Sequence, residues 1–170
     1  MCIRDRFPYA NCYSLKESKT WFEKLNISQK IESDLPIERA IFSLLHICMM
    51  KLDISMVTWI FHALESIYGT NSGRGFNDMS SQIFFLLKIP ERKQKSFKKK
   101  LRELNDLRSS FVHGGYKVPH PLNDDINEQI YELTNFGVVL IICSLQQLMK
   151  NNWSGLKVSE VYEGNMCEHS

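Results

Sequence analysis

Two residues in the second half of the chain combine phosphate binding with proton transfer. Arg108 carries a permanent charge on a planar guanidinium that matches a phosphate in bidentate fashion. Five positions later, His113 carries an imidazole that exchanges a proton near neutral pH. Gly114 and Gly115 follow, and glycines let a nucleic-acid backbone approach closely. The pattern indicates acid–base chemistry on a phosphodiester; taken singly, the residues are also typical of a structural ion pair and a helix cap.

The segment before this pair is strongly basic. Residues 92–102 hold seven Lys or Arg and no acid, which leaves 14 basic and 19 acidic residues in the rest of the chain. Cations at this density repel one another, and a polyanionic partner offsets that cost. The segment is therefore a candidate polyanion-binding surface, with a merely solvated helix face as the alternative.

Helical geometry directs the two candidate residues to different sides. At 100° per residue, Arg108 falls inside an apolar stripe about 80° wide. That stripe holds Phe97, Leu101, Leu104 and Phe111. An arginine there must be buried with a partner, or must face a ligand or a second subunit. His113 projects about 140° away from Arg108 on an ideal helix, in line with Lys95, Lys98, Lys99 and Arg102.

The elements that position these residues are predicted to be helices. Capping-box spacing of Ser14 and Glu17 predicts a helix through Leu25. A helix is expected to begin at Pro36, and its apolar positions are Ile37, Ile41, Leu44, Leu45, Cys48 and Leu52. The next helix is expected from an N-cap at Asp53 to Gly69, and after a loop over 69–78 a short helix is expected from Met79 to Lys88. A long helix is expected from Pro90 to about Phe111 or His113. The last helix is expected from a cap at Asn123, with Asp124 and Asp125 in its first turn, to about Lys150.

The predicted fold class is all-α, because no alternating run is long enough for a sheet. We expect a bundle of four to five helices, with the Arg108–His113 segment near the C-terminal end of the penultimate long helix. The helical domain is expected over 37–152 and a tail over 153–170. Residues 1–36 are expected to be the remnant of an upstream region, and residues 1–6 resemble a sequencing artefact.

Composition limits the classes of protein. The five cysteines form no CxxC pair, which is atypical of a disulfide framework or a zinc knuckle and indicates a reducing, cytoplasmic setting. The longest apolar run, Phe136 to Cys143, is far shorter than the ~20 residues that span a bilayer. Because no Cys, His or carboxylate cluster has ligand spacing, no metal or cofactor is expected.

Residues 107–115 read Leu-Arg-Ser-Ser-Phe-Val-His-Gly-Gly, which resembles the Arg-x4-His motif of HEPN domains. Within that family it most resembles the Apea-like branch, whose motif typically reads leucine-Arg-Ser, apolar residues, then His-Gly. Ala63-Leu64-Glu65 resembles the Ala-Leu-Glu often seen in that branch, and residues 84–87, Phe-Phe-Leu-Leu, fit the order of elements. The resemblance covers roughly residues 37 to 150.

This resemblance implies a helical homodimer with the two motifs facing each other. Many members are metal-independent endoribonucleases of antiviral defence or toxin systems, in which the ribose 2′-hydroxyl attacks the adjacent phosphate. By resemblance, Arg108 and His113 are the catalytic residues, and Ser109 takes the position where a polar residue follows the Arg. Glu65 is a supporting candidate that orients Arg108, and the RNA-binding candidates are Lys95, Lys98, Lys99 and Arg102. The branch usually has a domain upstream, which makes an upstream sensor domain or partner a further expectation.

Three hypotheses stay open at this point. The chain is an active HEPN ribonuclease, a catalytically silent module that dimerises or binds RNA or a nucleotide, or an unrelated helical interaction domain. Burial of Arg108 against a carboxylate such as Glu65 within one subunit favours the last, whereas a solvent-reachable cleft shared with His113 favours the first two, which an RNA cleavage assay separates. His120, between two prolines, is a second candidate for proton transfer.

Overall fold

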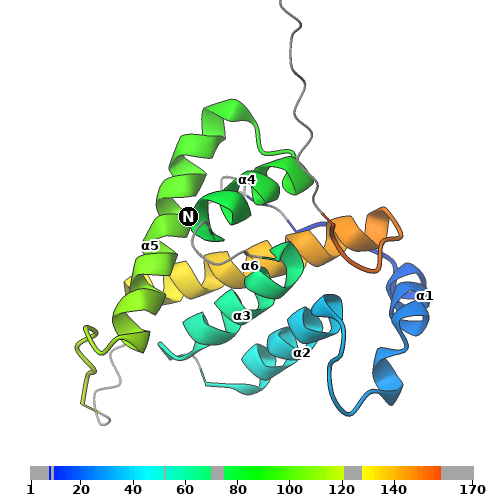
Figure 1. Cartoon of the computed structure of the whole chain (residues 1–170), viewed down its shortest axis with the longest axis horizontal. Helices are drawn as coiled ribbons and strands as arrows, with labels where there is room; N and C mark the ends of the chain where they lie inside the picture. Colours follow the sequence, from blue (N-terminus) through cyan, green and yellow to red (C-terminus); the bar gives the residue numbers. More distant parts are fainter. Residues whose placement is uncertain (1–7, 9, 52, 70–74, 121–127, 158–170) are drawn as a thin grey trace, which may run out of the picture.

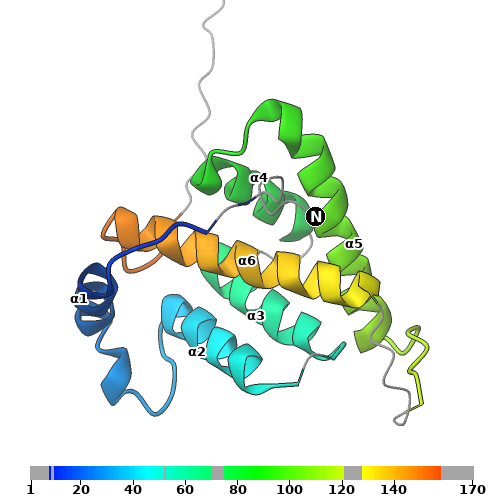
Figure 2. The same ribbon diagram turned by 180° about the vertical axis from the view of Figure 1, so that it is seen from behind.

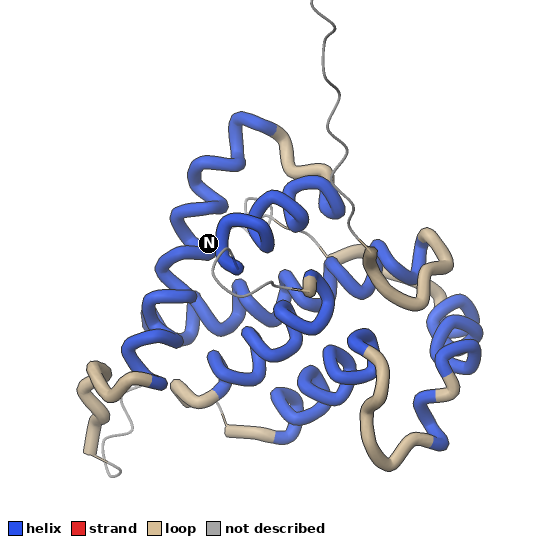
Figure 3. The backbone as a smooth tube through the Cα atoms, in the orientation of Figure 1, coloured by secondary structure: helices blue, strands red, loops and turns tan. Residues whose placement is uncertain are grey.

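The computed structural model describes residues 8, 10–51, 53–69, 75–120 and 128–157. In these residues the chain forms six α-helices and a short 3-10 helix and no strand (Figures 1 and 3), so the all-α prediction is confirmed. The elements are α1 (Leu15–Leu25), η2 (Ile27–Gln29), α2 (Pro36–Met49), α3 (Met56–Tyr68), α4 (Gly75–Leu87), α5 (Glu91–Val112) and α6 (Glu128–Lys150).

Helix α6 is the central element of a bundle formed by α2 to α6. It crosses the molecule with α3 along one side, and α3 in turn carries α2 on its outer side (Figures 1 and 2). Helices α4 and α5 cover the remaining part of α6 and α3. By length and composition α6 is apolar enough to cross a membrane, but more than half of its apolar window is buried in the bundle, as in the core helix of a globular fold.

A glycine fixes the packing of the helix that carries the candidate site. A Cβ atom on Gly137 of α6 would lie 2.6 Å from Cγ2 of Ile60 on α3 and 3.1 Å from Cδ2 of Leu104 on α5. Real Cβ atoms essentially never lie 2.6 Å from another heavy atom, and 3.1 Å is tighter than most Cβ contacts, so α6 approaches Ile60 at a distance that only glycine allows. Residues of α3 and α5 therefore both pack against α6 at this glycine.

Several predicted helix ends are confirmed by the structure. The Ser14–Glu17 capping box is formed, Pro36 is the first residue of α2, and Gly69 ends α3 with a φ of 59°. Helix α5 follows Pro90 and ends at Val112, with His113 as its C-cap.

Other boundaries were predicted wrongly. Ser55, and not Asp53, precedes the first turn of α3, because the Asp53 carboxylate accepts hydrogen bonds from the backbone and hydroxyl of Ser55 and folds the preceding turn. Helix α4 begins at Gly75, earlier than Met79, so residues 75–78 are helical and not part of the expected loop. Helix α2 ends at Met49, and its residues Leu45 and Cys48 are exposed instead of facing the core. The cap predicted at 123–125 and the apolar position at 52 lie outside the described residues.

The described part of residues 1–36 is attached to the C-terminal end of α6 (Figures 1 and 2). Trp21 of α1 is only 5% exposed, and its Nε1–H donates to the carbonyl of Trp153 at 3.1 Å. Asn11 and Gln146 exchange two hydrogen bonds of 2.8 and 2.7 Å. This segment and the start of the tail therefore pack on the same unit as the bundle.

Three cysteines lie in the described part of the chain, and one of them is buried. Cys12 and Cys48 are exposed and Cys143 is buried, all three with free thiols. Burial raises the pKa of the Cys143 thiol to about 11, so it stays protonated near neutral pH and is a poor nucleophile.

Candidate functional site

Arg108 lies on the side of α5 that faces α3. Its Nη2 atom is 3.5 Å from Oε1 of Glu65, and its guanidinium carbon lies 5.3 Å from the centroid of the Phe61 ring. Both contacts come from α3, which packs with α5 against α6 at Gly137. The structure thus brings together Arg108 and Glu65, the residue that the sequence analysis named as a candidate for orienting Arg108.

The pair is not buried. The side chains of Arg108 and Glu65 are 36% and 38% exposed. An ion pair this exposed is screened by water and contributes on the order of 0–1 kcal/mol to stability. The other guanidinium donors have no hydrogen-bond partner in the described part of the chain. Arg108 is therefore oriented by Glu65 and Phe61 while most of its donors remain open to a ligand, and the burial that would mark a purely structural pair is missing.

His113 ends α5 and its side chain is exposed. The backbone leaves the helical conformation here, with φ −96° and ψ 11°, and the His113 N–H donates to the carbonyl of Ser109 at 3.0 Å. Tyr116 closes the turn, because its N–H donates to the carbonyl of Ser110 at 2.9 Å and its ring packs edge-on against Phe111. This local frame holds the end of the helix and leaves the imidazole in solvent.

The two motif residues do not meet within one chain. Among the residues that the structure describes, no hydrogen bond or ion pair joins the side chains of Arg108 and His113. Arg108 faces α3, and His113 sits at the point where α5 ends. Ser109 is exposed between them and contributes a backbone carbonyl to the final turn.

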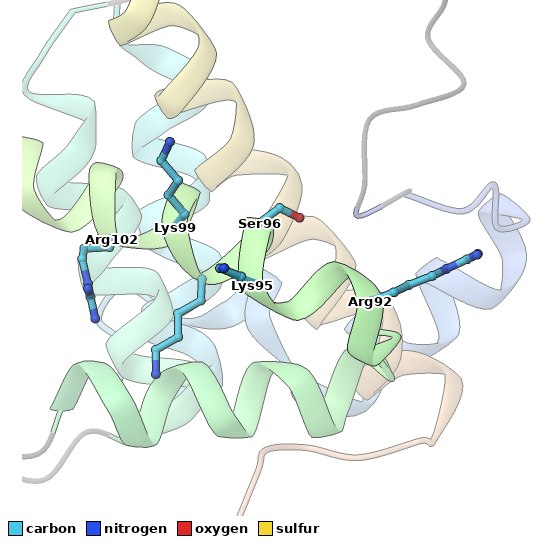
Figure 4. A pocket seen from close by; sticks show the side chains of 6 residues that line it. Arg92, Lys95, Ser96, Lys99 and Arg102 are labelled. Atoms are coloured by element: carbon cyan, nitrogen blue, oxygen red, sulfur yellow. The ribbon is translucent and has the colours of Figure 1, made fainter.

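The basic face of α5 is defined here as Arg92, Lys95, Lys98, Lys99 and Arg102. Together with Ser96, these residues line an open surface hollow, and all of its lining residues among those described belong to α5. Figure 4 shows that the labelled side chains project from the helix in different directions. Arg102 also lies 5.8 Å from the Phe76 ring of α4, and Lys99 is 3.8 Å from Glu103.

Two members of the hollow were missing from the sequence candidates. Arg92 stands three positions before Lys95, and Ser96 stands three positions before Lys99, so helical periodicity was the signal that would have added them. Not every cation of the run belongs to this face, since Lys100 lies 5.5 Å from the Phe136 ring of α6.

The remaining histidines have other surroundings. His46 stacks on Trp59 with centroids 4.3 Å apart, and Nδ1 of His62 lies 2.7 Å from the Ser43 hydroxyl. His120 is exposed in the segment after α5. No group of three or more His, Cys, Asp or Glu suited to a metal ion occurs among the residues described.

Comparisons with known protein families, with curated proteins and with solved structures give no match. The features that bear on function therefore come from the structure alone. In an all-α bundle, one long helix carries a basic face, an oriented and accessible arginine, and an exposed histidine at its end.

Proposed function

We propose that the protein is a metal-independent endoribonuclease of the HEPN type. The observation that carries the proposal is the state of Arg108: Glu65 holds it at 3.5 Å, yet the side chain remains 36% exposed. A guanidinium that is oriented without being enclosed is preorganised for an incoming phosphate. Five residues on, the same helix presents an exposed imidazole, which supplies the proton-transfer group that phosphodiester cleavage needs.

The chemistry assigned to these residues is an attack within the RNA. The 2′-hydroxyl oxygen forms a bond to the adjacent phosphorus, and the bond from phosphorus to the 5′-oxygen breaks. One proton leaves the 2′-hydroxyl and another is delivered to the departing 5′-oxygen, so the products are a 2′,3′-cyclic phosphate and a 5′-hydroxyl. His113 is the acid–base residue, and Arg108 stabilises the charge that develops on the phosphate oxygens.

A homodimer completes this site. Because Arg108 turns toward α3 while His113 caps α5, one chain does not aim both at one phosphate in the observed conformation. Two chains with facing motifs supply two arginines and two histidines around one cleft, which also provides separate donors and acceptors for the two protons. The setting that fits this proposal is a cytoplasmic defence or toxin effector that acts with an upstream sensor domain or partner.

A second candidate is a non-catalytic RNA-binding module. The contact between Arg108 and Glu65 lies within one subunit, which is the arrangement expected when the arginine is a structural ion-pair residue. Under this hypothesis the basic face binds RNA and no phosphodiester is cut.

The deciding experiment is RNA cleavage by the purified protein in the presence of EDTA. We expect cleavage with chelator present, products that end in a 2′,3′-cyclic phosphate, and a rate loss on the order of 10²–10⁴-fold in His113→Ala. His46→Ala is the matched control, because His46 is also exposed on a helix and lies outside the motif. Cleavage that EDTA abolishes and a divalent ion restores would contradict the proposal.

Mixing chains tests the composite site. Arg108→Ala chains mixed with His113→Ala chains are expected to form dimers whose activity differs from that of either pure mutant. A protein that stays monomeric at micromolar concentration and still cleaves RNA at full rate would show that the site is complete in one chain.

A further inference from the structure

The basic face and His113 lie along one side of the same helix. Arg92 and Arg102, at the ends of the basic face, are ten residues apart, a rise of about 15 Å. His113 follows Arg102 by eleven residues, about 16 Å further along the axis. At 100° per residue, Lys95, Arg102 and His113 fall within an arc of about 20°. A ligand that runs along the basic face is therefore directed toward His113.

The form of the basic face suits an extended polyanion. A small anion such as a single phosphate needs donors that converge on one point, whereas the labelled side chains in Figure 4 diverge. Arg92, Lys95, Lys98 and Arg102 have no acidic partner within the described residues. Separated, unpaired cations match the regular charge spacing of a nucleic-acid strand, about 3.4 Å per stacked nucleotide.

An acidic interval separates this face from the motif. Glu103 and Asp106 are the charged residues between Arg102 and Arg108. Asp106 is exposed, and helical geometry places it about 20° from the line of Lys95 and His113. A carboxylate at that place repels a phosphate, so a strand that follows α5 is bound on either side of this interval and not within it.

We infer that α5 holds RNA at two points with a fixed separation: the basic face as an anchor, and the Arg108–His113 segment as the place of cleavage. This inference rests on the proposed function and specifies its substrate as an extended single strand. The anchor covers roughly four or five stacked nucleotides, and the interval to His113 covers roughly five more. Strands shorter than about ten nucleotides reach only one of the two points.

The test uses the full chain and a set of single-stranded RNAs of one repeated sequence, from roughly four to twenty nucleotides long. Binding is measured with the His113→Ala protein, so that the RNA stays intact, and cleavage is mapped with the wild type. We expect affinity to rise steeply up to about ten nucleotides and then to level off, with efficient cleavage beginning at the same length.

A double variant isolates the anchor. In Lys95→Gln/Lys99→Gln, binding to long strands is expected to weaken about tenfold, and the salt dependence to fall by about 1.4 in the slope of log K against log salt. Lys16→Gln/Lys19→Gln is the matched control, because both pairs lie exposed on a helix and each includes a lysine in an exposed contact with a glutamate four residues on, Lys99–Glu103 or Lys19–Glu23. Asp106→Asn should tighten binding of long strands by a few fold.

The two proposals fail in different ways. Binding that does not depend on strand length, or a double variant that behaves as its control, overturns the two-point inference even if the protein cleaves RNA. Length-dependent binding with no cleavage by the wild type supports the two-point contact and overturns the ribonuclease proposal.

Discussion

The two halves of α5 differ in whether their cationic side chains have partners. Residues 91–102 carry cations that project in different directions, most of them without an acidic partner among the residues described. In residues 103–113 the single cation, Arg108, is held 3.5 Å from Glu65 and lies against the Phe61 ring. Both halves share one buried stripe, in which Phe97, Leu101 and Leu104 are at most 4% exposed.

This difference separates binding from chemistry. An unpaired cation on an exposed face retains its charge for a polyanion and tolerates many ligand positions. An oriented cation gives up part of its freedom in advance, which matters where one phosphate must be held in one geometry. The continuous apolar stripe lets one helix carry both functions, because the core positions the whole of α5 irrespective of what its outer face does.

The largest effect is expected from Arg108→Ala, which tests the second half of α5, residues 103–113 (the motif half). We expect cleavage to fall on the order of 10²–10³-fold, because the variant removes the group assigned to the developing charge. The free energy of unfolding should change by less than about 1 kcal/mol, since the Glu65 pair is exposed. The measurements are single-turnover cleavage and chemical denaturation of the same preparations.

Arg108→Lys sharpens this test. Lysine keeps the charge but lacks the planar fork, so it should recover only a small part of the activity. A large loss of stability in Arg108→Ala, with RNA cleavage unaffected, would assign the residue to the structural hypothesis instead.

The next largest effect is expected from neutralising the first half of α5, residues 91–102 (the basic half). The variant changes Lys95, Lys98, Lys99 and Arg102 to glutamine and should flatten the salt slope of single-strand binding by up to about 2.8. Affinity is expected to fall to a similar degree for all sequences, because phosphate contacts carry no base information. An unchanged salt slope would mean that this face is only solvated. Thermal stability should stay the same or rise as repulsion is relieved.

Local signals predicted most of the helices. The Ser14 capping box, Pro36, Gly69 and Pro90 each act within one turn, so the sequence places those helix ends correctly. The wrong predictions arose where a contact between helices, and not the local sequence pattern, decides which residues are buried. Leu45 has the right periodicity for the core, yet α2 packs mainly on α3 and leaves that residue 52% exposed.

For the site, the sequence placed Arg108 correctly within the apolar stripe and Glu65 as its companion. It did not reveal that the pair stays open to solvent, because exposure depends on how α3 and α5 pack against each other and against α6 at Gly137. The count of cations over residues 92–102 also overstated the binding surface, since Lys100 turns toward Phe136. Such distinctions depend on tertiary contacts between elements far apart in the chain.

Gly137→Ala tests whether the core sets the motif half. The added methyl meets Ile60, which is fully buried and whose branched side chain is stiff, so we expect a loss of about 1 to 2 kcal/mol and a Tm lower by roughly 2 to 8 °C. Gly155→Ala is the control, because a methyl group added there would meet nothing within 4 Å beyond its own chain neighbours. Displacement of α3 from α5 should reduce cleavage more than RNA binding; an equal effect on both would show that the two halves are not independent.

Glu65→Gln carries the smallest expected effect and separates the two roles of the ion pair. Glutamine keeps the shape of the side chain but removes its charge, so stability should change by less than about 1 kcal/mol. Cleavage should fall only a few fold, because Phe61 still holds one face of the guanidinium. Combined with Arg108→Ala in a double-mutant cycle, the variant gives two coupling energies, one from denaturation and one from cleavage rates. If Glu65 serves to orient a catalytic arginine, the coupling in cleavage exceeds the coupling in stability, because Glu65→Gln has nothing left to disturb once Arg108 is gone. The structural hypothesis requires the reverse order.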